Sequence, residues 1–213
     1  MSKSVSGITR LSGENRVDTA IAIAKSSHTG QVSNVILTTA DNFPDALTGS
    51  VLAYKLNASI LLVGSSLDDQ NKVLSYLKNN MLTTGTVYIL GGIVAVSADM
   101  ASKVVAEGFT NITRLGGIDR YETASIIADA LDVKTGTPVV IVYGENYPDA
   151  LSISGVAADM QYPIFLVNGN SLSVATAQKI SAINPIKVYI IGLKRAVSQE
   201  IQDQVSTLTS LNP

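Results

Sequence analysis

The sequence predicts an α/β protein built from two tandem copies of one unit, each a small parallel β-sheet flanked by helices. The first observation behind this prediction is a repeat, because residues 8–24 and 112–128 share ten of seventeen residues. The second is that short apolar runs alternate with helical segments within each copy. These runs are continuously apolar, a pattern typical of strands that are covered on both faces, as in a parallel sheet.

The repeat extends along nearly the whole chain. Asn42–Leu47 recurs as Asn146–Leu151 at the same offset of 104 residues, whereas from Val87 onwards the offset is 101. The loss of three residues falls in a loop, where length changes are tolerated. Each copy has about 100 residues, far more than a solenoid repeat, and can form its own small domain. We therefore expect two domains, over residues 7–109 and 110–213.

The elements of the first copy follow from apolar periodicity and from helix-end signals. A helix is expected from about Arg16 to Ser26, because its apolar residues recur on one face. Val35–Thr39 is the first strand, an apolar run bounded by polar residues. A second helix starts at Pro44, since proline favours the first turn of a helix. Ile60–Val63 is the next strand.

The same alternation continues to the end of each copy. A third helix begins near Asp68, Thr86–Leu90 is the third strand, and a fourth helix opens at Ser97, a residue type that caps helix N-termini. The second copy has its strands at Val139–Val142, Ile164–Val167 and Val188–Ile191. Strands that alternate with helices predict right-handed βαβ units around an open sheet, in a Rossmann-like or flavodoxin-like arrangement.

Composition narrows the possible functions. With 213 residues, 46% of them hydrophobic, the chain can bury a globular core. It has no cysteine, which excludes disulfides and thiolate metal sites, and its net charge of −2 argues against a nucleic-acid partner. No apolar run approaches the roughly 18 residues of a membrane span. His28 is the only histidine and no nucleotide-binding motif occurs, so we expect no cofactor, no metal and no catalytic triad.

Two copies of one motif carry a family resemblance. Arg10–Ala20 reads Arg-Leu-Ser-Gly-Glu-Asn-Arg-Val-Asp-Thr-Ala, Arg114–Ala124 reads Arg-Leu-Gly-Gly-Ile-Asp-Arg-Tyr-Glu-Thr-Ala, and each is followed by a strand and then Pro-Asp-Ala-Leu. The chain thereby resembles the cell-wall-binding repeat 2 family of clostridial and related Gram-positive surface proteins. The resemblance implies a secreted, non-catalytic module at the cell wall. Such a module attaches proteins non-covalently by recognising an anionic secondary wall polymer, teichoic-acid-like or polysaccharide, usually beside a separate effector domain.

The sequence departs from the family in its number of copies. The resemblance implies three consecutive copies in a pseudo-threefold arrangement, whereas this sequence contains two, and a third would start near residue 213. Either a third repeat is missing or this protein uses two. If a groove shared by three copies binds the polymer, two copies alone would bind weakly. We then expect self-association to supply the missing contacts.

Cations at the start of a helix are unusual, because the helix dipole disfavours them there. Arg16 and Arg120 both occupy this position, which indicates a nearby anion. That anion is either structural (Asp18, Glu122 or a Pro-Asp-Ala-Leu carboxylate) or a phosphate or carboxylate group of the polymer. A guanidinium suits such groups through its fork of donors.

Four further cations are candidate polymer contacts. Arg10 and Arg114 lie just before a glycine turn, where we expect them to be more exposed, and both a structural and a ligand-binding role stay open for them. Lys194 and Arg195 follow Gly192 and form the best local basic patch in the sequence. A solvated loop also explains this pair.

The Pro-Asp-Ala-Leu blocks contribute polar candidates. Asp45 and Asp149 lie at a helix start, where a carboxylate favours the dipole, and we expect them to be structural or interface residues. Asn42 and Asn146 fit a helix cap or an Asx-turn and are further candidates for polymer binding. The carboxylates could instead perform acid–base chemistry. However, an enzyme rarely keeps two equivalent sites in one chain, whereas a binding module gains avidity from them.

Taken together, these patterns predict a wall-anchoring module that captures a repeating polyanion. Two alternatives stay open. A small carbohydrate-active α/β hydrolase would have one deep, asymmetric pocket. A structural or oligomerisation module without a ligand would use the repeated arginines and aspartates to hold the copies together.

Overall fold

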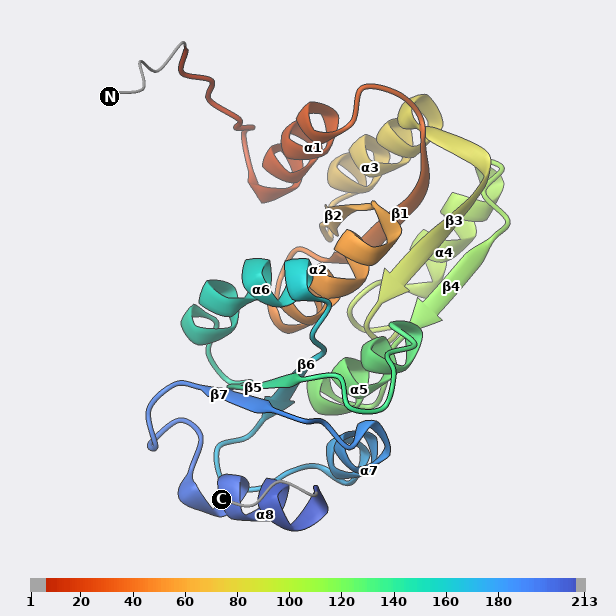
Figure 1. Cartoon of the computed structure of the whole chain (residues 1–213). Coiled ribbons are helices and arrows are strands. Elements are labelled where there is room, and N and C mark those ends of the chain that lie inside the picture. The colour runs from red at the N-terminus through yellow and green to blue at the C-terminus, as the bar shows by residue number, and fades with distance from the viewer. Residues whose placement is uncertain (1–6, 210–213) are drawn as a thin grey trace.

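The computed structural model describes residues 7–209, and its elements alternate along the chain in the predicted order (Figure 1). The helices are α1 (Arg16–Ser27), α2 (Pro44–Leu56), α3 (Leu67–Asn80), α4 (Ala98–Ala106), α5 (Arg120–Ala130), α6 (Pro148–Met160), α7 (Val174–Ile183) and α8 (Gln199–Leu208). The strands are β1 (Val32–Thr39), β2 (Ser59–Val63), β3 (Met81–Leu90), β4 (Ile112–Leu115), β5 (Val139–Tyr143), β6 (Ile164–Val167) and β7 (Val188–Ile191).

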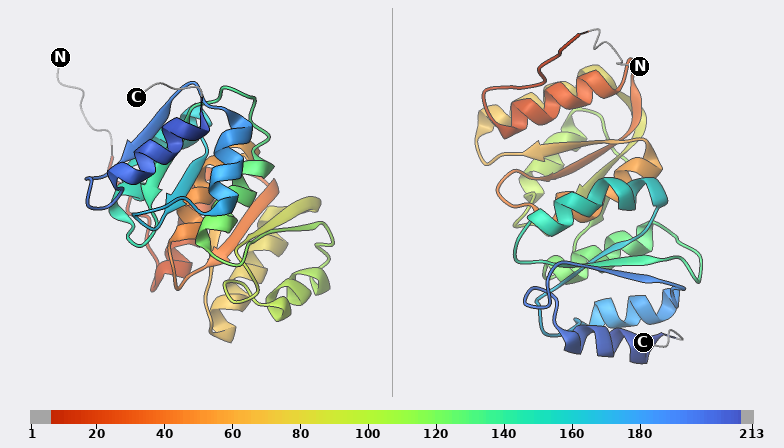
Figure 2. Two further views of the ribbon diagram at one scale, coloured as in Figure 1. Left: turned by 90° about the horizontal axis from the view of Figure 1, so that it is seen from below. Right: turned by 60° about the vertical axis from the view of Figure 1, so that its left-hand side comes forward.

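The strands form two separate parallel sheets flanked by helices, which confirms the predicted fold class. The strand order is β2-β1-β3-β4 in the first sheet and β6-β5-β7 in the second. The order 2-1-3-4 is that of a flavodoxin-like doubly wound sheet. Figure 2 shows the two sheets one above the other, with α2, α5 and α6 in the layer between them. The predicted strands are all present, and β1 and β3 extend further toward the N-terminus than expected.

Strand β4 was not predicted. It opens the second copy of the repeat motif, yet it pairs in parallel with β3 of the first copy, with Val87 opposite Ile112 and Leu90 opposite Leu115. A segment of the second copy thus completes the sheet of the first. The equivalent segment of the first copy, Ile8–Leu11, forms no strand, and β7 has β5 as its only strand neighbour within residues 7–209.

A shared hydrophobic core joins the two copies. Leu52 on α2 is 1% exposed and packs in one cluster with Ile127 on α5 and Val142 on β5. Helix α2 lies against both α5 and α6 (Figure 1). The corresponding position on α6 is Val156, which is 58% exposed because residues 7–209 contain no third copy to cover it. The same position of the repeat is therefore core in one copy and surface in the other.

The helix starts follow their sequence signals with one exception. Ser97 caps α4 as predicted, since its hydroxyl group accepts the N–H of Met100. Pro44 is the first residue of α2, also as predicted.

The exception concerns the asparagines that precede these prolines. Neither Asn42 nor Asn146 forms the expected cap or Asx-turn. The Oδ1 atom of each accepts the N–H of the next residue, at 2.9 Å, and Phe43 and Tyr147 hold the N-cap positions of α2 and α6. The chain turns into each helix one residue later than expected, at the residue before the proline, so the asparagine side chain cannot reach the helix amides.

The shared core predicts a difference between two equivalent positions. We expect Leu52→Ala to lower the free energy of unfolding by about 2–5 kcal/mol, because it removes a buried side chain from the core between the copies. Val156→Ala should change it by no more than about 0.5 kcal/mol, as is usual at the surface. Urea denaturation of dilute protein measures both. Equal losses at the two positions would contradict the shared core.

Candidate functional site

A groove of about 730 Å³ lies on the surface where the two copies meet. The carboxyl ends of β1 and β3, the first turn of α2 and the segment that enters α5 form its walls. The lining residues are Thr39, Asp41, Asn42, Pro44, Asp45, Gly92, Ile93, Val94, Ala95, Gly117, Ile118, Asp119, Arg120 and Thr123. The carboxyl ends of parallel strands are the usual ligand region of such sheets. The groove therefore needs both copies to form.

An aspartate packed against a glycine turn forms one wall of this groove. Gly91 follows β3 with a φ of +96°, and a Cβ atom on it would lie 2.4 Å from Oδ2 of Asp45. Both the backbone conformation and the close carboxylate require glycine there. In the second copy Gly192 has a φ of +119°, and a Cβ atom on it would lie 2.7 Å from Oδ2 of Asp149. The two copies thus place the same carboxylate against the same turn.

Arg16 and Arg120 each bind a backbone carbonyl group of their own copy, just after a strand. Nη1 of Arg120 donates to the carbonyl oxygen of Gly144 at 2.6 Å, and Nη1 of Arg16 donates to that of Ala40 at 2.5 Å. Arg120 also lies 3.5 Å from a carboxylate oxygen of Glu145. Arg120 is half-buried whereas Arg16 is exposed, because only Arg120 has a preceding copy beside it.

Asp18 and Glu122, two of the alternative partners considered for these arginines, do not pair with them. Asp18 pairs with Lys72 at 3.1 Å, and the carboxylate of Glu122 accepts the N–H of Ile118 at 2.6 Å. Residues two positions apart on a helix do not face each other, so neither carboxylate can meet the arginine that precedes it by two.

Arg114 holds the turn after β3. Its Nη1 donates to the carbonyl oxygens of Gly91 and Gly92, at 3.0 and 3.2 Å. Burial lowers the pKa of this guanidinium. The expectation that Arg114 is more exposed is wrong, because β4 pairs with β3 and carries the side chain over the turn. Arg10 is exposed, and no residue between 7 and 209 forms an ion pair or hydrogen bond with it.

One carboxylate of the groove has a shifted pKa. Burial raises the pKa of Asp45 above its ordinary value of 3.8, and the positive charge of Arg120 partly offsets this rise. Asp45 belongs to the first copy and Arg120 to the second. The electrostatic state of the groove therefore depends on the contact between the copies, and Arg120 acts on a Pro-Asp-Ala-Leu carboxylate of the neighbouring copy.

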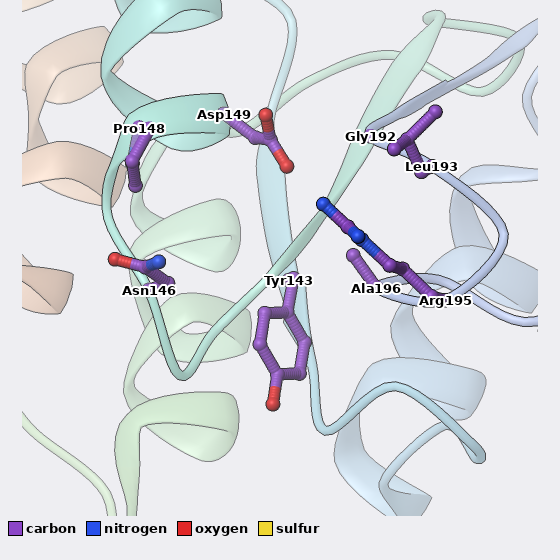
Figure 3. Close-up of a pocket in the computed structure, with 8 residues that line it drawn as sticks. All are labelled: Tyr143, Asn146, Pro148, Asp149, Gly192, Leu193, Arg195 and Ala196. Carbon is purple, nitrogen blue, oxygen red and sulfur yellow. The ribbon is translucent and has the colours of Figure 1, made fainter.

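A second groove, of about 550 Å³, occupies the equivalent place in the second copy (Figure 3). It is lined by Tyr143, Asn146, Pro148, Asp149, Gly192, Leu193, Arg195 and Ala196. Figure 3 shows the Arg195 side chain and the Asp149 carboxylate pointing toward each other across it. Nζ of Lys194, on the same loop, donates to Oε1 of Gln199 at 2.8 Å. Among the described residues, none supplies this groove with a wall equivalent to the segment that enters α5.

Sequence reasoning missed several residues at these grooves. Ile93, Val94 and Ile118 present large apolar side chains to solvent at the first groove. Tyr121 donates a short hydrogen bond to Glu145, and burial together with this bond raises the pKa of the phenol. The sequence did contain one indication of these groove residues. Ile93 and Val94 form an apolar pair in the loop after a strand, where polar residues are usual.

The structure of residues 7–209 was also searched for metal-binding clusters and for membrane-spanning helices. This part of the chain contains no cluster of three or more acidic or histidine side chains that could hold a metal ion. It also contains no helix long and apolar enough to cross a membrane.

The fold and the two grooves define a duplicated α/β module whose ligand regions lie open at the surface. Residues 10–101 and 114–202 each match cell wall binding domain 2 (CWB2). The chain belongs to this family, and the two matched segments correspond to the two copies of the repeat. The protein is therefore a secreted, cell-wall-associated protein with tandem wall-binding repeats, as the sequence resemblance implied.

Related proteins support this assignment. N-acetylmuramoyl-L-alanine amidase LytC of Bacillus subtilis is 28% identical over 205 residues, which are 96% of this chain and 40% of LytC. The solved structures of Cwp6 and Cwp8 from Clostridium difficile are each 29% identical, with TM-scores of 0.83 and 0.84. The matches cover 99% and 93% of this chain but 34% and 33% of Cwp6 and Cwp8. The chain thus spans 40% or less of each of these relatives.

The contacts of Arg114 predict a difference from its repeat partner. We expect Arg114→Ala to lower the free energy of unfolding by about 1–3 kcal/mol, because two carbonyl groups lose a charged donor. Arg10→Ala should stay within about 0.5 kcal/mol of the parent protein. Thermal and chemical denaturation measure both. A larger loss at Arg10 than at Arg114 would contradict the assignment.

The raised pKa of Asp45 predicts a pH-dependent effect. Folding favours the protonated acid, so this contribution to stability is present below pH 3.8 and is lost as pH rises through the folded pKa. Asparagine imitates the neutral acid. We expect Asp45→Asn to raise the melting temperature at pH 7 and to have little effect near pH 3. Asp149→Asn is the control for losing a carboxylate at this helix position. A loss of stability at pH 7 would contradict the prediction.

Proposed function

We propose that the protein is a non-catalytic module that anchors a surface protein to the Gram-positive cell wall by binding an anionic secondary polymer in its grooves. The observation that carries this proposal is that the same groove framework occurs twice in one chain. Each copy presents an asparagine, a proline and an aspartate beside a glycine turn. A repeating polymer can occupy both grooves at once, and linked weak contacts give high avidity.

Charge favours the second groove as the main anion site. Lys194 and Arg195 stand where the first copy has two apolar residues, and Asp149 is the only carboxylate among the lining residues. The lining of the first groove contains three carboxylates and a single guanidinium, that of Arg120. With a net charge of −2 the whole chain does not attract a polyanion, so the contact depends on such local clusters. Arg195 therefore makes the principal contact in this proposal.

The other predicted contacts add to this site. Arg16 and Arg120 each use Nη1 for a backbone carbonyl group, which leaves further donors of a guanidinium with five N–H groups. Asn42 and Asn146 keep the amide nitrogen available, because only Oδ1 is used locally. Arg10 is exposed, so its guanidinium is accessible to an anionic group of the polymer. Arg114 is half-buried and holds the turn after β3, so its share in polymer binding is the smallest.

A purely structural role is the alternative that a specific observation favours. Arg114 and Arg120 both bind backbone carbonyl groups close to the junction of the two copies. The two roles predict different effects of replacing these arginines. If the role is binding, the variant stays folded but binds the wall less; if the role is structural, wall binding does not change in a variant that stays folded. Catalysis has less support, since the two grooves are open and share one framework.

The proposal predicts salt-sensitive binding to purified cell walls. We expect Arg195→Ala to weaken binding about tenfold or more, because hydrogen bonds to charged groups contribute about 1.5–3 kcal/mol. Lys134→Ala, which removes an exposed cation elsewhere, should bind as the parent does. Binding should also fall between 0.15 and 1 M salt, as the screening length drops from about 8 to about 3 Å. Sedimentation with walls that retain or lack their anionic polymer measures all three.

The same assay separates binding from structure. We expect Arg120→Ala to weaken binding to the wall. The melting temperature of the same variant is measured in parallel and shows whether it stays folded. If Arg120→Ala and Arg195→Ala unfold the protein or leave binding unchanged, the structural alternative holds. Full binding to walls stripped of the polymer would refute the polymer as ligand.

A further inference from the structure

Within residues 7–209, three large apolar side chains lie exposed at the first groove. Ile93 and Val94, in the loop after β3, are 68% and 98% exposed, and Ile118, in the segment that enters α5, is 94% exposed. The two segments adjoin, because a Cβ atom on Gly92 would lie 3.5 Å from the carbonyl oxygen of Gly117. We call Ile93, Val94 and Ile118 the apolar lip of the groove. Apolar side chains gathered at a groove are typical of a surface that binds a ligand.

The charges that line this groove disfavour an anionic ligand. The lining contains a single guanidinium, that of Arg120, and three carboxylates, those of Asp41, Asp45 and Asp119. Arg120 lies 3.5 Å from a carboxylate oxygen of Glu145, so part of its charge is already balanced. A phosphate or carboxylate group in this groove would meet more negative than positive charge, and like charges repel each other at short range. An uncharged group meets no such cost.

The polar groups of the groove differ in how far they are already used. Asp119 caps α5, since its Oδ1 accepts a helix N–H at 2.8 Å, and Asp45 packs against the glycine turn after β3. Asp41 is exposed, and no residue between 7 and 209 bonds to its carboxylate. In the next residue, Asn42, only Oδ1 is bonded locally, which leaves the amide nitrogen available. The groove thus presents a hydrogen-bond acceptor and a donor on two neighbouring residues.

A sugar unit has the features that match this surface. One face of a pyranose ring carries C–H groups, which pack on aliphatic side chains, and its hydroxyl groups both donate and accept hydrogen bonds. A hydroxyl group that donates to the Asp41 carboxylate would form a charge-assisted bond. Donors on Asn42 and Arg120 remain for the other hydroxyl oxygens. Sites for small ligands commonly combine apolar walls with a few polar groups that fix the orientation of the ligand.

The second copy has cations at two positions of the apolar lip. In the repeat, Ile93 and Val94 correspond to Lys194 and Arg195, at the offset of 101 residues. The lining of the second groove contains Arg195 and a single carboxylate, that of Asp149. Figure 3 shows the Arg195 side chain directed across this groove. The two grooves share one framework, so a pair of loop positions distinguishes the ligands that they favour.

We propose that the first groove binds an uncharged sugar unit of the wall polymer and that Ile93 and Val94 determine this specificity. The second groove takes the anionic group, through Arg195. This specificity rests on the proposed binding of a wall polymer and adds the chemical class that each groove accepts. A polymer that combines sugar units with anionic groups then contacts both grooves, and the linked contacts raise its avidity.

Fragments of the polymer test this assignment. Partial acid hydrolysis of purified wall polymer yields oligosaccharides, which ion exchange separates into uncharged, anionic and cationic fractions. Each fraction is added to isotope-labelled protein, and NMR follows the backbone amide signals. We expect the uncharged fraction to shift the signals of Gly92, Val94 and Ile118. The anionic fraction should shift those of Leu193 and Arg195.

Exchanging the two loop pairs tests the residues that determine specificity. We expect Ile93→Lys combined with Val94→Arg to weaken binding of the uncharged fraction about tenfold or more, because two apolar contacts are lost. The same variant should gain binding of the anionic fraction at the first groove. The reverse exchange, Lys194→Ile with Arg195→Val, should weaken binding of the anionic fraction about tenfold or more. All four side chains are exposed, so these variants keep their core.

A matched control separates the position of the charges from their number. Val174→Arg combined with Ile186→Lys makes the same change of charge at two exposed apolar residues outside both grooves. This variant should bind both fractions as the parent does. If it gained binding of the anionic fraction as the exchange at residues 93 and 94 does, net charge would decide the specificity and the proposal would be wrong.

Three further outcomes would overturn the proposal. One is an uncharged fraction that leaves the signals of Gly92, Val94 and Ile118 unchanged. Another is an anionic or cationic fraction that shifts these signals in the parent protein, and the third is full binding of the uncharged fraction after the exchange at residues 93 and 94. If the anionic fraction still binds at Arg195, only the assignment of the first groove fails. If no fraction binds either groove, the binding of a wall polymer itself fails.

Discussion

The pairing of β4 with β3 is the interaction on which the rest of the structure depends. It joins the two copies by backbone hydrogen bonds and carries Arg114 over the turn after β3, where it binds two carbonyl groups. Gly116 passes so close to Gly91 that a Cβ atom has no space. The chain then enters α5 along the wall of the groove, which places Arg120 near Asp45. Strand β4 also contributes Leu115 to the shared core.

Duplication makes the two copies alike in fold but different in environment. Within residues 7–209 the first copy is covered by the second, whereas no described residue covers the corresponding surfaces of the second copy. The grooves differ in charge for a separate reason, because Lys194 and Arg195 replace two apolar residues. In the proposed function, two grooves of one framework and different charge hold different groups of one repeating polymer. Two open grooves of this kind fit a binding module better than an enzyme, which would have a single enclosed reaction centre.

In the proposed function, binding depends on the geometry and the repetition of the grooves more than on the net charge of the chain, which is −2. The lining of the first groove contains more carboxylates than guanidinium groups, so only a well-placed anionic group gains from it. In the proposed function, weak and local contacts suit an anchor, since several of them together hold the protein on a repeating polymer. In LytC of Bacillus subtilis the region similar to this chain makes up 40% of the protein.

The sequence by itself determined the fold class, the duplication and most elements. These follow from local patterns: continuous apolar runs predict strands covered on both faces, and Ser97 and Pro44 mark helix starts through contacts within one turn. The sequence also singled out residues of the grooves. The Pro-Asp-Ala-Leu blocks contribute Pro44 and Asp45 to the first groove and Pro148 and Asp149 to the second, whereas the repeated motif lines the first groove alone.

Only the tertiary structure decided which segments of the two copies meet. Strand β4 has four residues and no strong pattern, and it becomes a strand because β3, more than twenty residues earlier, offers an edge. The identical Ile8–Leu11 forms no strand. The burial of Arg114, the raised pKa of Asp45 and the partners of Arg120 all follow from this distant pairing. Local sequence cannot specify them, because identical residues acquire different neighbours in the two copies.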